Sequence, residues 1–88
     1  MNETLTLNDG TVLNGHALGS EDELFLYVYG TTLADLYPLI SDAEKTAKIQ
    51  EDRNGDQMIY TGYNYLYSIR EERSGMVSAG LRMVTDNG

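Results

Sequence analysis

The 88-residue sequence has no cysteine and no tryptophan, and it has one proline and one histidine. Without cysteine the chain can form no disulfide, no thiol nucleophile and no zinc–thiolate site. The histidine, His16, has no second histidine with which to form a metal site, and we interpret it as a loop residue. The G-x-S-x-G, H-E-x-x-H and phosphate-loop motifs of common enzymes are absent. We therefore expect a protein that is not an enzyme and binds neither a metal nor a cofactor.

Basic residues and long apolar runs are also scarce. Six Lys and Arg stand against fourteen Asp and Glu, which gives a net charge of -8. Direct nucleic-acid binding relies on clustered positive charge, so it is not expected. No run reaches the length of about 18 apolar residues that suits a membrane span, and "MNETLTLNDG" does not resemble a secretory signal. These absences predict a protein that is cytoplasmic at synthesis and has no membrane partner.

The composition that remains is that of one small globular domain. Hydrophobic residues make up 41% and charged residues 23%, which is too apolar for a disordered chain. A chain of this length suits a single core, so residues 1–88 are expected to form a single domain. The simplest interpretation of the acidity is solubility, and a sharper one is contact with a basic surface.

Turn residues between short alternating runs predict β-hairpins. "TLTLNDGTVLNG" alternates around Asp9-Gly10, and "AKIQEDRNGDQMIYTG" alternates around Asn54-Gly55, a pair suited to a type I′ turn. The run "LFLYVY", residues 24–29, predicts a central strand with its aliphatic side chains toward the core and its aromatic side chains on the other face.

The turn at residues 54–55 also fixes the pairing of its strands. It sets Glu51 opposite Met58 and Ile49 opposite Tyr60, and we expect Ile49, Met58 and Tyr60 to share the inner face. Gly62 follows this strand, and a bend is expected there.

One helix is predicted in "TTLADLYPLIS", residues 31–41. Its apolar positions follow the helical period, and Thr32 is a suitable N-cap; the periodic residues are Leu33, Leu36, Tyr37 and Ile40. Pro38 lies beyond the first turn, so we expect a short or kinked helix. Ser41 with Glu44 resembles a second cap and predicts one further turn.

The last hairpin, "YNYLYSIREERSGMVSAGLRMV", allows two registers. A three-residue loop ending at Gly75 sets Tyr67 against Leu81 and Ile69 against Ala79. A two-residue turn instead sets Tyr67 against Arg82. We favour the first register because it pairs apolar side chains across the strands. An outer strand at residues 76–84 could pair with a second copy and make a homodimer.

Together these elements predict an α+β fold. It consists mainly of an antiparallel sheet of about five to six strands in hairpins, with one short helix packed on it.

The stretch "IYTGYNYLYSI" holds four of the seven tyrosines, and their role has two interpretations. In the first, the rings cover the sheet of the domain itself, which its small size favours. In the second, they form a surface for another protein, because tyrosine is enriched at interfaces. As a hypothesis we place a protein-interaction site on the tyrosines of two strands, with an acidic rim beside it: Tyr27, Tyr29, Tyr63, Tyr65 and Tyr67, and Glu21, Asp22, Glu23, Glu71 and Glu72.

The order of the segments "LTLNDGTVL", "TLADLYPLIS", "DAEKT", "IYTGYNYLYSI" and "SAGLRMV" resembles small uncharacterised proteins of phages and prophages of Gram-positive bacteria. Genes for these proteins often lie near tail or baseplate genes. The resemblance rests on turn and packing residues, such as Asp9-Gly10, Lys45-Thr46 and Gly62-Tyr63. It implies a phage structural or accessory protein that is made in a bacterial host, binds another protein and is carried in the virion.

An alternative is a small phage-encoded inhibitor of the anti-CRISPR or nucleic-acid-mimic type. Its acidic surface would compete with nucleic acid for a basic host protein. Such an inhibitor needs carboxylates gathered on one face, whereas a packing module would scatter them. The acidic residues fall mainly in the expected loops, which favours scatter.

Overall fold

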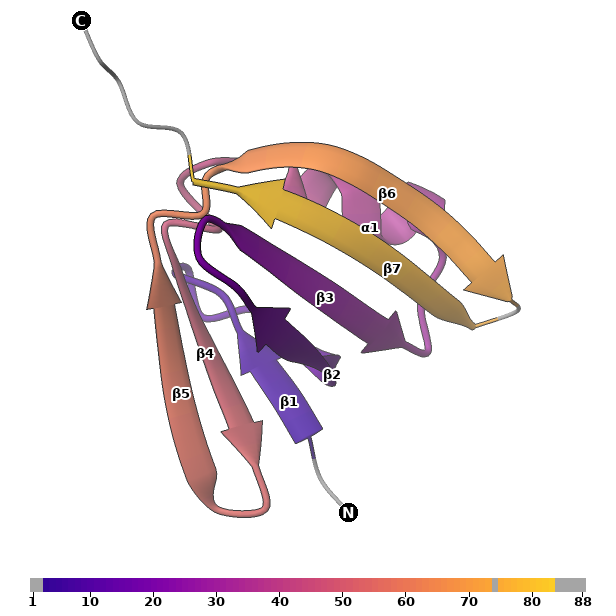
Figure 1. The fold of residues 1–88 in the computed structure, drawn as a ribbon. Helices are drawn as coiled ribbons and strands as arrows, with labels where there is room; N and C mark the ends of the chain where they lie inside the picture. The colour runs from indigo at the N-terminus through magenta and orange to yellow at the C-terminus, as the bar shows by residue number, and fades with distance from the viewer. Residues whose placement is uncertain (1–2, 74, 84–88) are drawn as a thin grey trace, which may run out of the picture.

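The computed structural model describes residues 3–73 and 75–83, which form one antiparallel sheet and one helix (Figure 1). The strands are β1 (Glu3–Thr6), β2 (Val12–Gly19), β3 (Glu23–Tyr29), β4 (Lys48–Arg53), β5 (Asp56–Thr61), β6 (Tyr65–Arg73) and β7 (Met76–Arg82), and the helix is α1 (Leu33–Ile40). They lie in the order β5-β4-β1-β2-β3-β7-β6. The predicted α+β class is confirmed, with seven strands among the described residues in place of five to six. No helix in this part of the chain is long and apolar enough to cross a membrane.

β3 is an inner strand of the sheet, between β2 and β7, in agreement with the central strand that the sequence predicted. Its aliphatic side chains Leu24, Leu26 and Val28 are buried, and α1 covers the same side with Leu36 and Ile40. Figure 1 shows α1 behind β6 and β7. The buried apolar cluster draws on most elements: Leu5, Leu7, Ala17, Leu24, Leu26, Val28, Leu36, Ile40, Ile49, Tyr63, Val77, Ala79 and Leu81.

The hairpins predicted around Asp9-Gly10 and Asn54-Gly55 both form, as β1–β2 and β4–β5. Asn54 and Gly55 both have positive φ, at 53° and 91°, as a type I′ turn requires. The pairing of Ile49 with Tyr60 is confirmed. Met58 shares the face of Ile49 and Tyr60, as predicted, because it pairs with Glu51 of β4, but its side chain is 56% exposed.

The helix α1 begins where it was predicted, because the Thr32 side chain accepts a hydrogen bond from the Asp35 amide at 3.2 Å. It contains Pro38 and is short, at eight residues. Tyr37 was wrongly assigned to its buried stripe and is 50% exposed. The stripe instead includes Leu39, which packs against the core.

The turn after α1 is built differently from the predicted second cap. The Ser41 amide donates to the Tyr37 carbonyl and so closes α1. Asp42 starts the next turn, because its carboxylate accepts from the Glu44 amide at 2.9 Å and its carbonyl accepts from the Lys45 amide.

The β6–β7 hairpin follows neither predicted register throughout. Arg73 pairs with Met76 across a two-residue loop, whose Ser74 lies outside the described residues. A register shift at Glu72 then sets Ile69 against Ala79, as the favoured register predicted. A second shift at Tyr67 sets Leu66, in place of Tyr67, against Leu81. These irregularities keep the aliphatic side chains over the core and leave the tyrosine free to turn away from it.

The edges of the sheet also differ from the expectation. β7 lies between β3 and β6, so residues 76–82 do not form an outer strand; residue 84 is outside the described residues. Within the described chain, the edge strands are β5 and β6.

Candidate protein-binding face

The candidate site lies on the side of β3, β7 and β6 that faces away from α1, which we call the outer face. Because strand side chains alternate, the buried aliphatic residues of β3 leave Phe25, Tyr27 and Tyr29 on this side. Strand pairing brings Phe25 beside Gly80 and Tyr27 beside Ser78 on β7. The outer face is therefore an aromatic row next to a row of small side chains.

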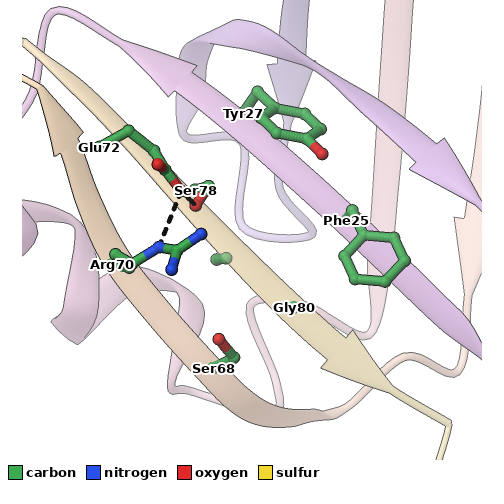
Figure 2. Close-up of a pocket in the computed structure, with 8 residues that line it drawn as sticks. Phe25, Tyr27, Ser68, Arg70, Glu72, Ser78 and Gly80 are labelled. Carbon is green, nitrogen blue, oxygen red and sulfur yellow. Dashed lines mark hydrogen bonds and ion pairs between the residues drawn. The ribbon is translucent and has the colours of Figure 1, made fainter.

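A hollow of about 220 Å³ opens on the outer face, above the small residues of β7. Figure 2 shows Phe25 and Tyr27 on one side of β7, and Arg70 and Ser68 of β6 on the other. The lining residues are Phe25, Tyr27, Ser68, Arg70, Glu72, Ser78, Ala79 and Gly80. The hollow thus has aromatic groups on its β3 side and polar groups on its β6 side.

The polar side of the hollow is held together by Glu72. One oxygen of its carboxylate accepts a hydrogen bond from the Ser78 hydroxyl at 2.6 Å and another from Arg70 Nε at 2.9 Å. These two bonds, that of Ser78 first, hold the pKa of Glu72 below its usual value. Glu72 is therefore ionised at neutral pH, and it forms an ion pair with Arg70.

Tyr67 contacts two residues of β7, Gly80 and Arg82. Its ring rests on Gly80. The guanidinium carbon of Arg82, also on β7, lies 4.3 Å from the centroid of the Tyr67 ring. Arg82 also pairs with Glu23 at 3.3 Å. Burial, followed by the nearby Glu23 carboxylate, raises the pKa of the Tyr67 hydroxyl. These contacts fix the direction of the ring.

The aromatic row continues onto β2 through His16, which we had interpreted as a loop residue. Its ring stacks on Tyr27 with centroids 5.0 Å apart, and its Nδ1 lies 3.2 Å from the Tyr29 hydroxyl. The hairpin pairing sets His16 opposite Tyr27. The sequence predicts the strand at residues 24–29 but gives it no pairing with residues 12–19, so the contact between His16 and Tyr27 was missed.

The structure brings together most of the predicted tyrosines. Tyr27, Tyr29, Tyr65 and Tyr67 share the outer face, where Tyr65 is 53% exposed and pairs with Arg82. Tyr63 does not belong there: it is 9% exposed, packs in the core and donates its hydroxyl to the Ser20 carbonyl at 3.3 Å. The preceding Gly62, with φ of 88°, turns the chain between β5 and β6. The bend predicted at Gly62 is thus confirmed, but the alternation of side chains did not show that it sends Tyr63 into the core.

The predicted acidic rim is only partly assembled. Glu21 and Asp22 are exposed in the turn before β3, while Glu23 is paired with Arg82. Glu71 lies on the helix side, where its carboxylate accepts from the Leu33 amide at 3.2 Å. Glu71 therefore supports the start of α1 and is not part of a rim around the outer face.

A second polar cluster, which sequence reasoning missed, surrounds the buried Glu51. This residue is 5% exposed, and one carboxylate oxygen accepts from the Ala17 amide at 2.8 Å and from Arg53 Nη2 at 2.7 Å. The Tyr60 hydroxyl lies 3.5 Å from the other oxygen; burial first, and then Glu51, raise its pKa. The cluster joins β4 to β2, two strands that β1 separates in the order of the sheet. Its role is thus structural.

Comparisons with known proteins give one partial match and no family. The chain is 38% identical over 68 residues to a 4,4'-dithiodibutanoate disulfide reductase of Rhodococcus erythropolis. The match covers 76% of this chain and 15% of the reductase. No family model matches the sequence, and no solved structure matches it. In the described residues, no group of three or more acidic or histidine side chains could hold a metal ion.

Proposed function

We propose that this chain is a non-enzymatic module that binds another protein through its outer face. The observation that carries the proposal is the aromatic row of β3, together with two tyrosines of β6, on a side of the sheet that α1 leaves uncovered: Phe25, Tyr27 and Tyr29, and Tyr65 and Tyr67. Tyrosine and phenylalanine provide large contact areas with few rotatable bonds, so they are favoured where proteins meet. An aromatic row uncovered by other elements is a natural docking surface.

The hollow supplies an anchor point for such a partner. Its floor is formed by small residues, and Phe25 and Tyr27 offer ring surfaces to a side chain that enters it. Arg70 and Glu72 already neutralise each other at 2.9 Å, so the hollow offers no unpaired charge. A neutral apolar or aromatic side chain of the partner fits this chemistry better than an ionic one.

The resemblance to phage and prophage proteins supplies the proposed setting. In that setting the partner is a structural protein of the tail or baseplate, or of its assembly. The module is made in the cytoplasm of a bacterial host and ends in the virion.

The match to the disulfide reductase favours a second candidate, in which the module serves a larger oxidoreductase. The matched stretch is a small part of that enzyme, which suits a module attached to a longer protein. This chain would bring no thiol of its own to such an enzyme, because it has no cysteine.

The inhibitor alternative draws less support from the charges. A nucleic-acid mimic needs free carboxylates on one face, yet Glu3, Asp42, Glu51 and Glu72 each lie within ion-pair distance of a basic side chain of the domain. Glu71 is bonded to the start of α1. The acidic groups are thus spread over both sides of the sheet and its loops.

Capture from a lysate of cells that naturally make the protein tests the proposal. The bait carries Tyr29→Ser and Tyr65→Ser, at outer-face side chains that are 40% and 53% exposed. The matched control is Tyr37→Ser on α1, where the side chain is 50% exposed. We expect one protein to be retained by the wild-type and control baits and lost from the outer-face bait.

Measurements on that purified protein complete the test. The Kd between the captured protein and the module should rise at least about tenfold for the outer-face variant. For the wild type this Kd should change little with salt, because the proposed contact is apolar. Equal binding by all three baits would overturn the proposal. Steep weakening as salt rises would instead support the inhibitor, and retention of an oxidoreductase would support the second candidate.

A further inference from the structure

The edge strand β5 has an open side along its whole length. The two-residue turn makes Asp56 the hydrogen-bonded partner of Arg53, and the alternation of an antiparallel ladder then directs Met58 and Tyr60 toward β4. The Gly62 amide continues the series by donating to the Ala47 carbonyl at 3.4 Å. The main-chain groups of Gln57, Ile59 and Thr61 therefore point outward. No strand of the described chain pairs with them.

β5 also lacks the features that normally prevent an edge from pairing. Its register with β4 is regular, Asp56 is its only charged residue, and Met58 and Ile59 are 56% and 52% exposed. The opposite edge, β6, has two register shifts and ends in the charged run 70–73. Bulges and charges of that kind protect sheet edges from association. Of the two described edges, only β5 is regular and carries a single charged residue.

We propose that β5 pairs antiparallel with β5 of a second copy of this chain, about a two-fold axis at Ile59. This register sets Ile59 against Ile59 of the copy and Gln57 against Thr61. All the outward main-chain groups are then used, in about six hydrogen bonds. A shift by two residues toward the turn would set Gln57 against Ile59 and leave Thr61 without a partner, so the symmetric register is favoured.

The symmetric register favours a second copy as the occupant of this edge, because it pairs apolar side chains and keeps the carboxylates of the two chains apart. Two chains of net charge -8 repel each other, so they can associate only where carboxylates stay apart. In the proposed register, Asp56 lies opposite Gly62 of the copy, and Met58 lies opposite Tyr60. The interface uses an edge and leaves the outer face open, so it is independent of the proposed docking function.

Single-cysteine variants test both the dimer and its register, because the chain has no other cysteine. In a hydrogen-bonded antiparallel pair the Cα atoms lie about 5.5 Å apart, within the range of about 4.4 to 6.8 Å that a disulfide spans. Ile59→Cys should therefore oxidise rapidly to a disulfide-linked dimer. Gln57→Cys lies about 14 Å from its own copy in this register and should not.

Sedimentation of the cysteine-free protein over a range of concentrations completes the test. We expect the wild type to sediment as a dimer. Ile59→Lys should sediment as a monomer, and its circular dichroism should show that it is folded. Val12→Lys, at a side chain that is 60% exposed and far from this edge, should remain dimeric. Thr61→Pro should also yield a folded monomer, because it removes an outward amide without touching the β4 ladder. A wild-type monomer at all concentrations, or equal crosslinking at positions 57 and 59, would overturn the proposal.

Discussion

The ring of Tyr67 lies directly on the backbone of Gly80. A Cβ atom at position 80 would lie 2.8 Å from the Tyr67 Cζ atom and 2.9 Å from its hydroxyl oxygen. The Arg82 guanidinium lies over the same ring. Glycine at this position thus allows the ring of Tyr67, which is outside the β6–β7 ladder, to lie against the backbone of β7.

Gly80→Ala should displace the Tyr67 ring and lower the free energy of unfolding by about 1 to 3 kcal/mol, the usual range for overpacking. Urea unfolding measures this loss. In a Tyr67→Ser background the same substitution should have little effect, because the clashing ring is gone. An equal loss in both backgrounds would show that the ring and the glycine are not coupled.

Glu51→Leu should destabilise the protein by about 1 to 3 kcal/mol, because it leaves the buried Ala17 amide without an acceptor. The loss is measured by urea unfolding, with Asp56→Asn at the exposed hairpin tip as control. The control should change stability by less than about 0.5 kcal/mol. If the two variants are equally stable, the Glu51 cluster does not hold β2 to β4.

The fold could be predicted from the sequence wherever a local signal fixes the backbone. Asn54-Gly55 determined its turn and the whole β4–β5 register, and Thr32 determined the start of α1. The β6–β7 register could not be predicted, since two irregularities at Tyr67 and Glu72 respond to the core beneath them and have no sequence signature. The seven-strand order depends on contacts far apart in the chain, such as β1 with β4.

The candidate site was likewise predicted only where it depends on local sequence signals. Period-two alternation placed Tyr27 and Tyr29 on one face of their strand, and the structure has them there. It could not separate Tyr63 from Tyr65, because the turn after Gly62 sends the first ring into the core. Alternation also could not detect the burial of Glu51. That burial depends on the amide of Ala17 in β2, which is 34 residues away in the chain.

Leu36→Ala should lower the free energy of unfolding by about 2 to 5 kcal/mol, because the side chain is fully buried between α1 and the sheet. Tyr37→Ala, at the next position, should change it by no more than about 0.5 kcal/mol, since that side chain is half exposed. Thermal and urea unfolding of the pair check this contrast. A large loss from the tyrosine variant would mean that α1 is rotated from its described position.

Stability should fall as the pH drops below the usual carboxyl pKa values of 4.5 for Glu72 and 3.8 for Asp9. The pKa of Glu72 is held below its usual value of 4.5 by Ser78 and Arg70, and that of Asp9 below 3.8 by the Thr11 amide. A carboxyl with a lowered folded-state pKa contributes stability above its unfolded pKa and loses it as the pH falls through the folded value. Between pH 7 and pH 3, the urea midpoint of the double variant Glu72→Gln/Asp9→Asn should therefore decline less steeply than that of the wild type. Parallel profiles would contradict this cause.

The docking account is tested most directly by photo-crosslinking at the outer face in cells that naturally make the protein. A photoreactive benzoylphenylalanine replaces Tyr29 on the outer face in one variant and Tyr37 on α1 in the other, two side chains of similar exposure. The account predicts that irradiation links the variant at position 29, and not that at position 37, to one defined protein. Equal products at both positions, or none at position 29, would contradict it.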